Sequence, residues 1–301
     1  MKPEELVQAG RLDEALAELQ TAVKAKPADS KLRVFLFQLL CVLGRWDRAM
    51  TQLNVAADMD PSTLLMAQVC RPALNSEALR AEIFAGRRMP LVMGQPDEWV
   101  GLLLQSANLA GLGRYAEAEQ IRDQAFESAP TVSGMIETAA ADAPSAAFEW
   151  IADADTRLGP MLEAIIDGRY YWVPYTRIKE IRIEEPKDLR DVVWAPANIL
   201  WTNGGHAVAL IPTRYPGSEA SPDPAIRLAR KTEWDDRGHG SYFGLGQRTF
   251  ATDAGEYSIL QVRRVVLNNA MTAAPPAPAG DSTSLHLKSG DPRSLGGGAG
   301  G

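Results

Sequence analysis

Two aspartates spaced two residues apart could do chemistry in this chain. They are Asp153 and Asp155, in the run Asp153-Ala154-Asp155-Thr156-Arg157. Paired carboxylates can bind a hard cation or carry out acid–base catalysis. However, neither a glycine nor a bidentate glutamate follows at the spacing of a calcium-binding loop. We therefore expect the two carboxylates to cap a helix near Gly159 and to pair with Arg157 or another arginine.

The histidines and glycine-rich loops do not form a recognisable catalytic constellation. His206, His239 and His286 lie far apart in the sequence and lack the spacing of metal ligands. The glycine loops at 204–205 and 238–246 lack the lysine of a phosphate-binding loop. Ser218 lacks the glycine two residues later that a nucleophile elbow requires. The sequence therefore predicts no metal, no cofactor and no enzymatic activity.

The elements that would position these residues begin with a helical hairpin at Leu32–Pro61. Apolar residues recur at three- and four-residue spacing up to Leu43, which indicates one face of a helix. A turn at Gly44 follows, and then a second helix whose inner face is marked by Ala49, Leu53 and Ala56. Pro61 ends that helix because proline cannot donate the next helical hydrogen bond.

The same pattern of glycine, alanine and proline occurs three times. Its members are Gly10, Ala15 and Pro27, then Gly44, Ala49 and Pro61, then Gly113, Ala118 and Pro130. From Gly10 to Gly44 is 34 residues, and from Gly44 to Gly113 is 69, one more than twice 34. A helix–turn–helix period of 34 residues is typical of tetratricopeptide repeats. The skipped repeat falls on residues 62–88, which we expect to be helical but interrupted at Pro72 and Asn75.

The composition is that of an ordinary soluble protein. The 301 residues carry a formal net charge of −7, whereas a nucleic-acid-binding surface would be basic. Cys41 and Cys70 lie in apolar helical surroundings, which favours free thiols in a reducing compartment. No stretch has the apolar run of a signal peptide or the length of a membrane span. We expect a cytoplasmic protein that binds no nucleic acid and does not insert into a membrane.

The second half reads as a mainly β domain. Five of the seven tryptophans and six of the seven tyrosines follow residue 148. Short apolar or alternating runs are separated by Gly, Pro and Asn, which is typical of strands, and Asn203-Gly204-Gly205 predicts a hairpin turn. The one clear helix is expected at Gly159–Ile166. The candidate strands are Phe148–Ala152, Arg169–Val173, Ile178–Ile183, Ala197–Trp201, His206–Pro212, Ala225–Lys231, Gly246–Ala251 and Tyr257–Val266.

The expected fold class is therefore α+β. Tetratricopeptide-like helical repeats occupy residues 1–143, with residues 131–147 as a linker or short helix. A compact, barrel-like, mainly β domain with one or two helices follows at 144–269. The tail at 270–301 is rich in Pro, Gly and Ala and poor in apolar residues. It cannot bury enough surface to offset chain entropy, so we expect it to be disordered.

Six strings in the second half resemble a known family. They are WIADADTRLGP at 150–160, DGRYYWVP at 167–174, DLRDVVWAPA at 188–197, IPTRYPGSE at 211–219, ARKTEW at 229–234 and GLGQR at 244–248. In this order they resemble the ImpE family, also called TagJ or SciE-type proteins, which are accessory proteins of bacterial type VI secretion systems. Helical repeats also precede this domain in the family, so the resemblance covers about residues 1–268.

The resemblance implies an adaptor and not an enzyme. Family members bind the N-terminal helix of the small sheath subunit TssB and are thereby linked to ClpV, the ATPase that recycles the contractile sheath. Stacked helix pairs suit this role because they form a concave groove that can hold a helix or an extended peptide. The positions opposite the packed alanines are predicted to face that groove: Lys31, Val34, Gln38, Cys41 and Val42 in the complete repeat, and Val100, Leu103 and Ala107 in the last one.

Two alternatives stay open on the sequence alone. One is an enzyme whose site lies in the loops of the β domain, formed by Asp153, Asp155, Arg214 and His239. The other is a general scaffold with a different client, such as ClpV itself. Arg214, like Arg248, could also anchor a carboxylate within the domain or on a partner. The conspicuous aromatic residues of the predicted strands are more typical of a core than of a binding surface: Tyr170, Tyr171, Trp172, Trp194 and Trp201.

Overall fold

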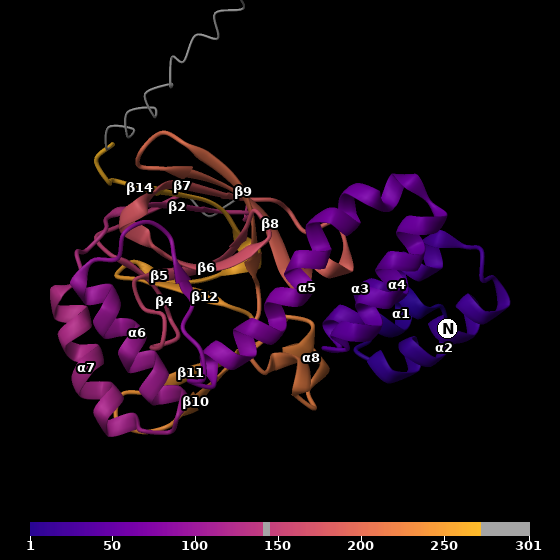
Figure 1. The fold of residues 1–301 in the computed structure, drawn as a ribbon, viewed down its shortest axis with the longest axis horizontal. Coiled ribbons are helices and arrows are strands. Elements are labelled where there is room, and N and C mark those ends of the chain that lie inside the picture. Colours follow the sequence, from indigo (N-terminus) through magenta and orange to yellow (C-terminus); the bar gives the residue numbers. More distant parts are fainter. Residues whose placement is uncertain (141–144, 272–301) are drawn as a thin grey trace, which may run out of the picture.

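The structure, a computed structural model, describes residues 1–140 and 145–271. Four helices form two antiparallel hairpins at one end of the molecule (Figure 1). A long helix, α5, then crosses to the β-sheets, where two further helices form a third hairpin. The helices are α1 (Pro3–Gln8), α2 (Leu12–Ala25), α3 (Ser30–Val42), α4 (Trp46–Met59), α5 (Leu64–Phe84), α6 (Glu98–Gly111) and α7 (Tyr115–Ser128).

The three predicted turns are present, which confirms the repeat pattern. Gly10, Gly44 and Gly113 have φ angles of 74°, 64° and 78°, in the left-handed region that favours glycine. The alanine five residues after each glycine has no exposed surface, so each hairpin's helices approach closely at that point. The third hairpin does not continue the stack of the first two, because α5 separates them and α6 and α7 lie beside the β-sheets (Figure 1).

Helix α5 is continuous, so the predicted interruption at Pro72 and Asn75 was wrong. Pro72 lies inside the helix, where it removes one hydrogen bond. Buried residues on both sides of it, including Ala67, Cys70 and Leu74, hold the helix against the rest of the core. Tertiary packing thus outweighs the local cost of the proline.

The main sheet has nine strands in the order β1-β6-β5-β9-β8-β7-β14-β2-β3. The terminal strands β1 and β3 have two and three residues and do not pair with each other. The sheet is therefore open, and the barrel-like closure expected from the sequence was wrong. Its strands are β1 (Leu91–Val92), β2 (Gly134–Thr138), β3 (Ala146–Phe148), β5 (Met161–Ile166), β6 (Arg169–Pro174), β7 (Ile178–Ile183), β8 (Trp194–Trp201), β9 (His206–Pro212) and β14 (Val262–Leu267).

Two smaller sheets complete the β part. One has the order β13-β12-β4, so β4 is an edge strand, and the other is the hairpin β10-β11. The strands are β4 (Ile151–Asp153), β10 (Thr232–Asp236), β11 (Tyr242–Gly246), β12 (Thr249–Thr252) and β13 (Gly255–Ser258). The predicted turn at Asn203-Gly204-Gly205 is confirmed: it joins the antiparallel strands β8 and β9, and Gly204 has a φ of 81°.

Three local predictions were wrong. The helix expected at Gly159–Ile166 is strand β5, whose six residues are all buried; a short, continuously apolar run does not distinguish a buried strand from a helix. The strand expected at Ala225–Lys231 contains instead the short helix α8 (Pro224–Arg227), capped by Asp223. The expected linker at 131–147 supplies β2 and part of β3 to the main sheet. The predicted disordered tail lies outside the described residues from residue 272 onward.

The hydrophobic core continues from the helices into the sheet. One cluster of buried residues includes Leu19 and Phe37 from the hairpins together with Trp172 and Trp194 from the strands. Tyr170, Trp172 and Trp194 are buried as expected for core aromatics, whereas Tyr171 and Trp201 are half-buried. The helices and the main sheet therefore pack as one body.

Candidate functional site

The loop residues considered for an enzyme site have structural partners. Asp153 pairs with Arg248 and accepts a hydrogen bond from the Tyr215 hydroxyl. Asp155 pairs with Arg157, with 2.8 Å between the carboxylate Oδ1 and the arginine Nε.

Arg214 and His239 are engaged as well. Arg214 donates to three backbone carbonyls. His239 is exposed, and its Nδ1 lies 3.3 Å from an oxygen of Glu119. Because three of the four predicted residues are buried in such contacts, this constellation does not support an enzyme site. The expected helix caps are also wrong, since strand β5 and not a helix follows Gly159; the expected pairing with arginine is confirmed.

A buried network of charges connects α5 to the sheets. The Glu163 carboxylate is fully buried and contacts Arg80 of α5, Arg248 and the Tyr170 hydroxyl. Burial alone would raise its pKa, but the charges of Arg248 and Arg80 prevail and lower the pKa of Glu163 to about 2. By contrast, burial raises the pKa of Asp153 to about 6, against the opposing charge of Arg248. Both carboxylates are fully engaged by these partners, so we assign the network a structural role: it holds α5 against the sheets.

Arg214 joins the repeats to the β part. Its guanidinium nitrogens lie 2.8 Å from the carbonyl oxygen of Val42 and 3.2 Å from that of Cys41, both at the C-terminal end of α3. Carbonyls in the last turn of a helix lack the usual helical partners, so a buried cation there is favourable; the Cys41 carbonyl also accepts from the backbone N–H of Gly44. Arg80 reaches the carbonyl of Arg214 at 2.6 Å. The predicted role of Arg214 as an anchor is thus found within the protein, on carbonyls and not on a carboxylate.

The structure separates the predicted partner-binding residues into two groups. Lys31, Val34 and Gln38 line a cleft at the N-terminal part of α3. Gln38 is nevertheless buried, with 6% of its surface exposed, and the other five are buried as well, with at most 7% of the surface of any of them exposed. Two lie at the end of α3 and three on α6, on the far side of α5 (Figure 1). The buried residues are Cys41, Val42, Val100, Leu103 and Ala107.

The cleft belongs to α3, α5 and a loop of the β part together. Met66 of α5 and Arg190 of the loop between β7 and β8 line it beside the α3 residues. Arg190 is held in place by Asp188, with 3.0 Å between the nitrogen and the carboxylate oxygen. The lining of the cleft thus carries two basic side chains, Lys31 and Arg190, and two acidic ones, Asp60 and Asp188.

An apolar trough continues from the cleft along α5. Met66 and Arg190 border both, and the trough runs on between α5 and strands β8 and β9. Three of its apolar side chains are unusually exposed: Leu65 at 72%, Val69 at 43% and Val208 at 70%. Contiguous exposed apolar residues mark interaction sites more often than isolated ones do. We call this surface the α5 trough, lined by Leu65, Met66, Val69, Pro72, Val208 and Leu210.

Sequence reasoning missed the trough residues. Leu64, Leu65 and Val69 are apolar, yet they lie outside the face of α5 that carries Ala67, Cys70 and Leu74 into the core. An excess of apolar residues around the whole circumference of a predicted helix is a usable signal. The place of Val208 in the trough could not be predicted from the sequence, because only the tertiary fold brings strand β9 against α5.

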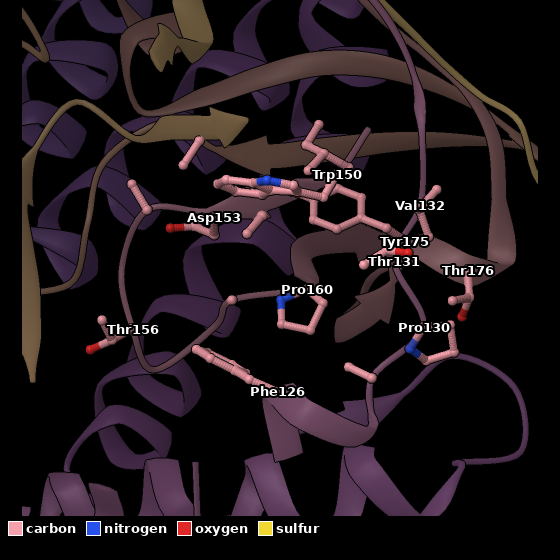
Figure 2. A pocket seen from close by; sticks show the side chains of 16 residues that line it. Phe126, Pro130, Thr131, Val132, Trp150, Asp153, Thr156, Pro160, Tyr175 and Thr176 are labelled. Carbon is pink, nitrogen blue, oxygen red and sulfur yellow. The ribbon is translucent and has the colours of Figure 1, made fainter. Parts of the chain in front are cut away.

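A second hollow lies on the β part. Its volume is about 430 Å³, and its walls come from the end of α7 and the following residues, from strand β4, and from Gly159-Pro160 and Tyr175-Thr176. Figure 2 shows Trp150 and Tyr175 on one side of the open space and Phe126 and Pro160 on the other. It shares no lining residue with the cleft or the α5 trough.

Two properties of the described residues bear on other functions. Within 1–140 and 145–271, no helix has the length and apolar character required to cross a bilayer. Over the same ranges, no three His, Cys, Asp or Glu side chains gather closely enough to hold a metal ion. Cys41 and Cys70 are both buried and free.

Comparisons with known proteins agree with the strings found in the sequence. Residues 145–266 match the ImpE protein family, and residues 6–69 match a tetratricopeptide repeat family. The chain is 48% identical over 265 residues to the type VI secretion system accessory component TagJ of Pseudomonas aeruginosa, covering 88% of this chain and 90% of that protein.

A solved structure shows the same fold. The crystal structure of protein VPA1032 from Vibrio parahaemolyticus superposes with a TM-score of 0.76 at 24% identity, over 88% of this chain and 97% of that one. The 265 residues matched to TagJ are too many to lie in the β part alone, so the resemblance reaches into the helical repeats. The chain belongs to the ImpE/TagJ family of type VI secretion system accessory proteins.

Proposed function

We propose that this protein is a non-enzymatic, cytoplasmic adaptor of a type VI secretion system that holds the N-terminal helix of a TssB-type sheath subunit. The observation that carries the proposal is 48% identity to an accessory component of such a system, TagJ, over most of both chains. Through the sheath subunit, the adaptor is linked to recycling of the sheath by the ClpV ATPase.

The helix is proposed to lie in the cleft and the α5 trough. An amphipathic helix binds by setting its apolar face into a hydrophobic groove, and Leu65, Val69 and Val208 offer such a surface. Val34, beside the buried Gln38, extends it into the cleft, where Lys31 can meet an acidic group of the helix and Asp60 a basic one. The other buried members of the predicted set contribute by fixing the helices that shape this surface: Cys41, Val42, Val100, Leu103 and Ala107.

The first test is a titration of the purified protein with a labelled peptide of the TssB N-terminal helix, followed by fluorescence anisotropy at modest salt. The unchanged protein is expected to bind. The double variant Leu65→Glu, Val69→Glu is expected to bind roughly tenfold or more weakly, because it places two charges in an apolar contact. Both positions are exposed, so the variant should fold normally.

Leu112→Glu is the matched control. Leu112 is 53% exposed and lies at the end of α6, outside the cleft and trough. It should bind as the unchanged protein does. Absence of peptide binding at high micromolar concentration would count against the TssB proposal, and equal losses in both variants would count against the location.

The link to ClpV needs a separate experiment. A pull-down with the unchanged protein from cells that contain the secretion system should recover the sheath subunit, with ClpV present only while the sheath subunit is present. Recovery of ClpV from cells that lack the sheath subunit would instead favour the alternative of a general scaffold with ClpV as its direct client.

A further inference from the structure

The α5 trough consists of two hollows that follow each other along one side of a helix. Helix α5 passes beside strands β8 and β9 (Figure 1), and the two parts of the trough between them have volumes of about 410 Å³ and 380 Å³. We call them the Leu65 hollow and the Pro72 hollow, because each of these α5 residues lines only that one of the two. Leu65, Val69 and Pro72 lie four and three residues apart, which places them on the same side of α5.

Two exposed valines stand between the hollows. Val69 of α5 and Val208 of β9 line both hollows and come from opposite walls of the trough. The deeper apolar residues belong to one hollow only: Met66 and Trp194 to the Leu65 hollow, and Ile165 and Ala209 to the Pro72 hollow. An occupant that fills the trough must therefore place one apolar group on each side of the two valines.

The offset between the hollows matches one turn of a helix. Leu65 and Val69 flank the first hollow along α5, and Val69 and Pro72 flank the second. The hollows are thus three to four residues apart along α5, or roughly 5 Å at the rise of an α-helix. Side chains three or four residues apart on a second helix project from one face with the same separation.

The walls favour a helix over an extended peptide. At Ala209 and Leu210, strand β9 already pairs with β5 on one side and with β8 on the other. An extended peptide would find no strand edge there, and its backbone N–H and C=O groups would lose water without gaining partners. A helix satisfies its own backbone groups and needs only side-chain contacts.

The charged residues of the trough leave its interior to apolar groups. Arg190 and Asp191 line the Leu65 hollow and pair with each other, with 3.5 Å between the arginine Nε and a carboxylate oxygen. Gln68 and Asp167 line the Pro72 hollow and are exposed. A bound helix would therefore turn an apolar face to the trough and keep its polar face in water.

We propose that the α5 trough recognises an amphipathic helix by two apolar side chains three or four residues apart, one in each hollow. Val69 and Val208 pack between these two anchors. The inference rests on the proposed function for the identity of the partner, since it predicts that the sheath-subunit helix carries such a pair on one face.

The test uses designed peptides and the full-length protein. Each labelled, alanine-based peptide has about 18 residues, enough to form a helix. The first carries two leucines four residues apart, the second carries them two residues apart on opposite faces, and the third keeps the four-residue spacing but has proline between the leucines to break the helix. Fluorescence anisotropy should show that the first peptide binds at least roughly tenfold more tightly than the other two, because only it buries both leucines.

Two charge variants locate the anchors. Leu65 lines only the Leu65 hollow and Gln68 only the Pro72 hollow, and both are exposed. Leu65→Glu and Gln68→Glu should each weaken binding of the first peptide by roughly tenfold. In double-mutant cycles with peptides that have one leucine replaced by alanine, the two variants should couple to different leucines. Leu112→Glu, outside the trough, should couple to neither, and circular dichroism establishes that each variant is folded.

Three results would overturn the proposal: no saturable binding of the first peptide at millimolar concentration, equal binding of the three peptides, or coupling of both charge variants to the same leucine or to none. The TssB peptide is titrated in parallel to separate the two proposals. If it binds while the first designed peptide does not, the anchor pattern is wrong and the proposed function stands. If the designed peptide binds while the TssB peptide does not, the anchor pattern stands and the proposed partner is wrong.

Discussion

Substitution of Glu163 by glutamine should strongly destabilise the protein and change how its stability depends on pH. The carboxylate is fully buried between Arg80 and Arg248. Its removal leaves the buried positive charges of Arg80 and Arg248 without this counter-ion. Breaking a buried ion pair in this way typically costs about 3–5 kcal/mol, and we expect Glu163→Gln to lower the free energy of unfolding at pH 7 by that amount.

The pH dependence gives the sharper signature. The pKa of Glu163 is lowered from 4.5 to about 2 in the folded state. A lowered carboxylate pKa contributes stability that is complete above the unfolded pKa and is lost as pH falls through the folded one. The gap between the two pKa values corresponds to about 3 kcal/mol, of which about 2 kcal/mol should disappear between pH 6 and pH 3.

Urea unfolding at a series of pH values measures this term as the difference between the unchanged protein and Glu163→Gln. The difference should shrink by about 2 kcal/mol from pH 6 to pH 3. Glu82→Gln is the matched control, because Glu82 pairs with Arg87 on an exposed face; it should leave the free energy of unfolding nearly unchanged throughout. A difference for Glu163→Gln that stays constant over this range would refute the assigned ionic role.

Three further predictions follow from single positions. Burial raises the pKa of Asp153 from 3.8 to about 6, so the folded state holds the proton more tightly and the free energy of unfolding should fall by about 2 kcal/mol as pH rises from about 4 to 6. Asp153→Asn should abolish that part of the urea-unfolding profile. In the same assay, Gly44→Ala should lower the free energy of unfolding by about 1–2 kcal/mol more than Gly113→Ala does. Both glycines have positive φ, but only at Gly44 would the new Cβ clash, at 2.4 Å from the Glu219 side chain. Tyr175→Phe should raise the free energy of unfolding by about 1 kcal/mol, measured by urea unfolding, since it removes a buried hydroxyl that lacks a partner among the described residues.

The repeats were predictable because their signal is local. Gly10, Gly44 and Gly113 required positive φ, and the alanine that follows each required a close approach of two helices. Both requirements act within one hairpin and leave a periodic trace in the sequence. The interruption expected at Pro72 failed for the opposite reason: helix α5 is held by contacts with distant elements, and no local rule describes those contacts.

The β part was predicted strand by strand but not as a sheet. Alternation and turn residues located β6, β7 and β9, whereas strand order depends on pairing between distant segments. Strand β5 was misassigned because it is buried on both faces and has no alternation to reveal it. The charge network was likewise hidden, since Arg248 and its two carboxylate partners Asp153 and Glu163 are separated by 95 and 85 residues in sequence.

The same contacts explain why the candidate surface is not a property of the repeats alone. Repeat arrays usually bind partners in a groove formed by successive hairpins. Here α5 replaces the next hairpin, and Arg214 and Arg80 fix the end of α3 and the C-terminal part of α5 to the sheets. One wall of the trough is therefore a strand, β9, through Val208.

This arrangement has a consequence for dissecting the protein. A fragment that ends after the second hairpin would keep Lys31, Val34 and Gln38 but lose Leu65, Val69, Val208 and the anchoring charge of Arg214. We expect such a fragment to bind a helical peptide far more weakly than the whole chain does, even if its own helices form. The candidate surface thus requires the repeats and the β part together, because each supplies one wall.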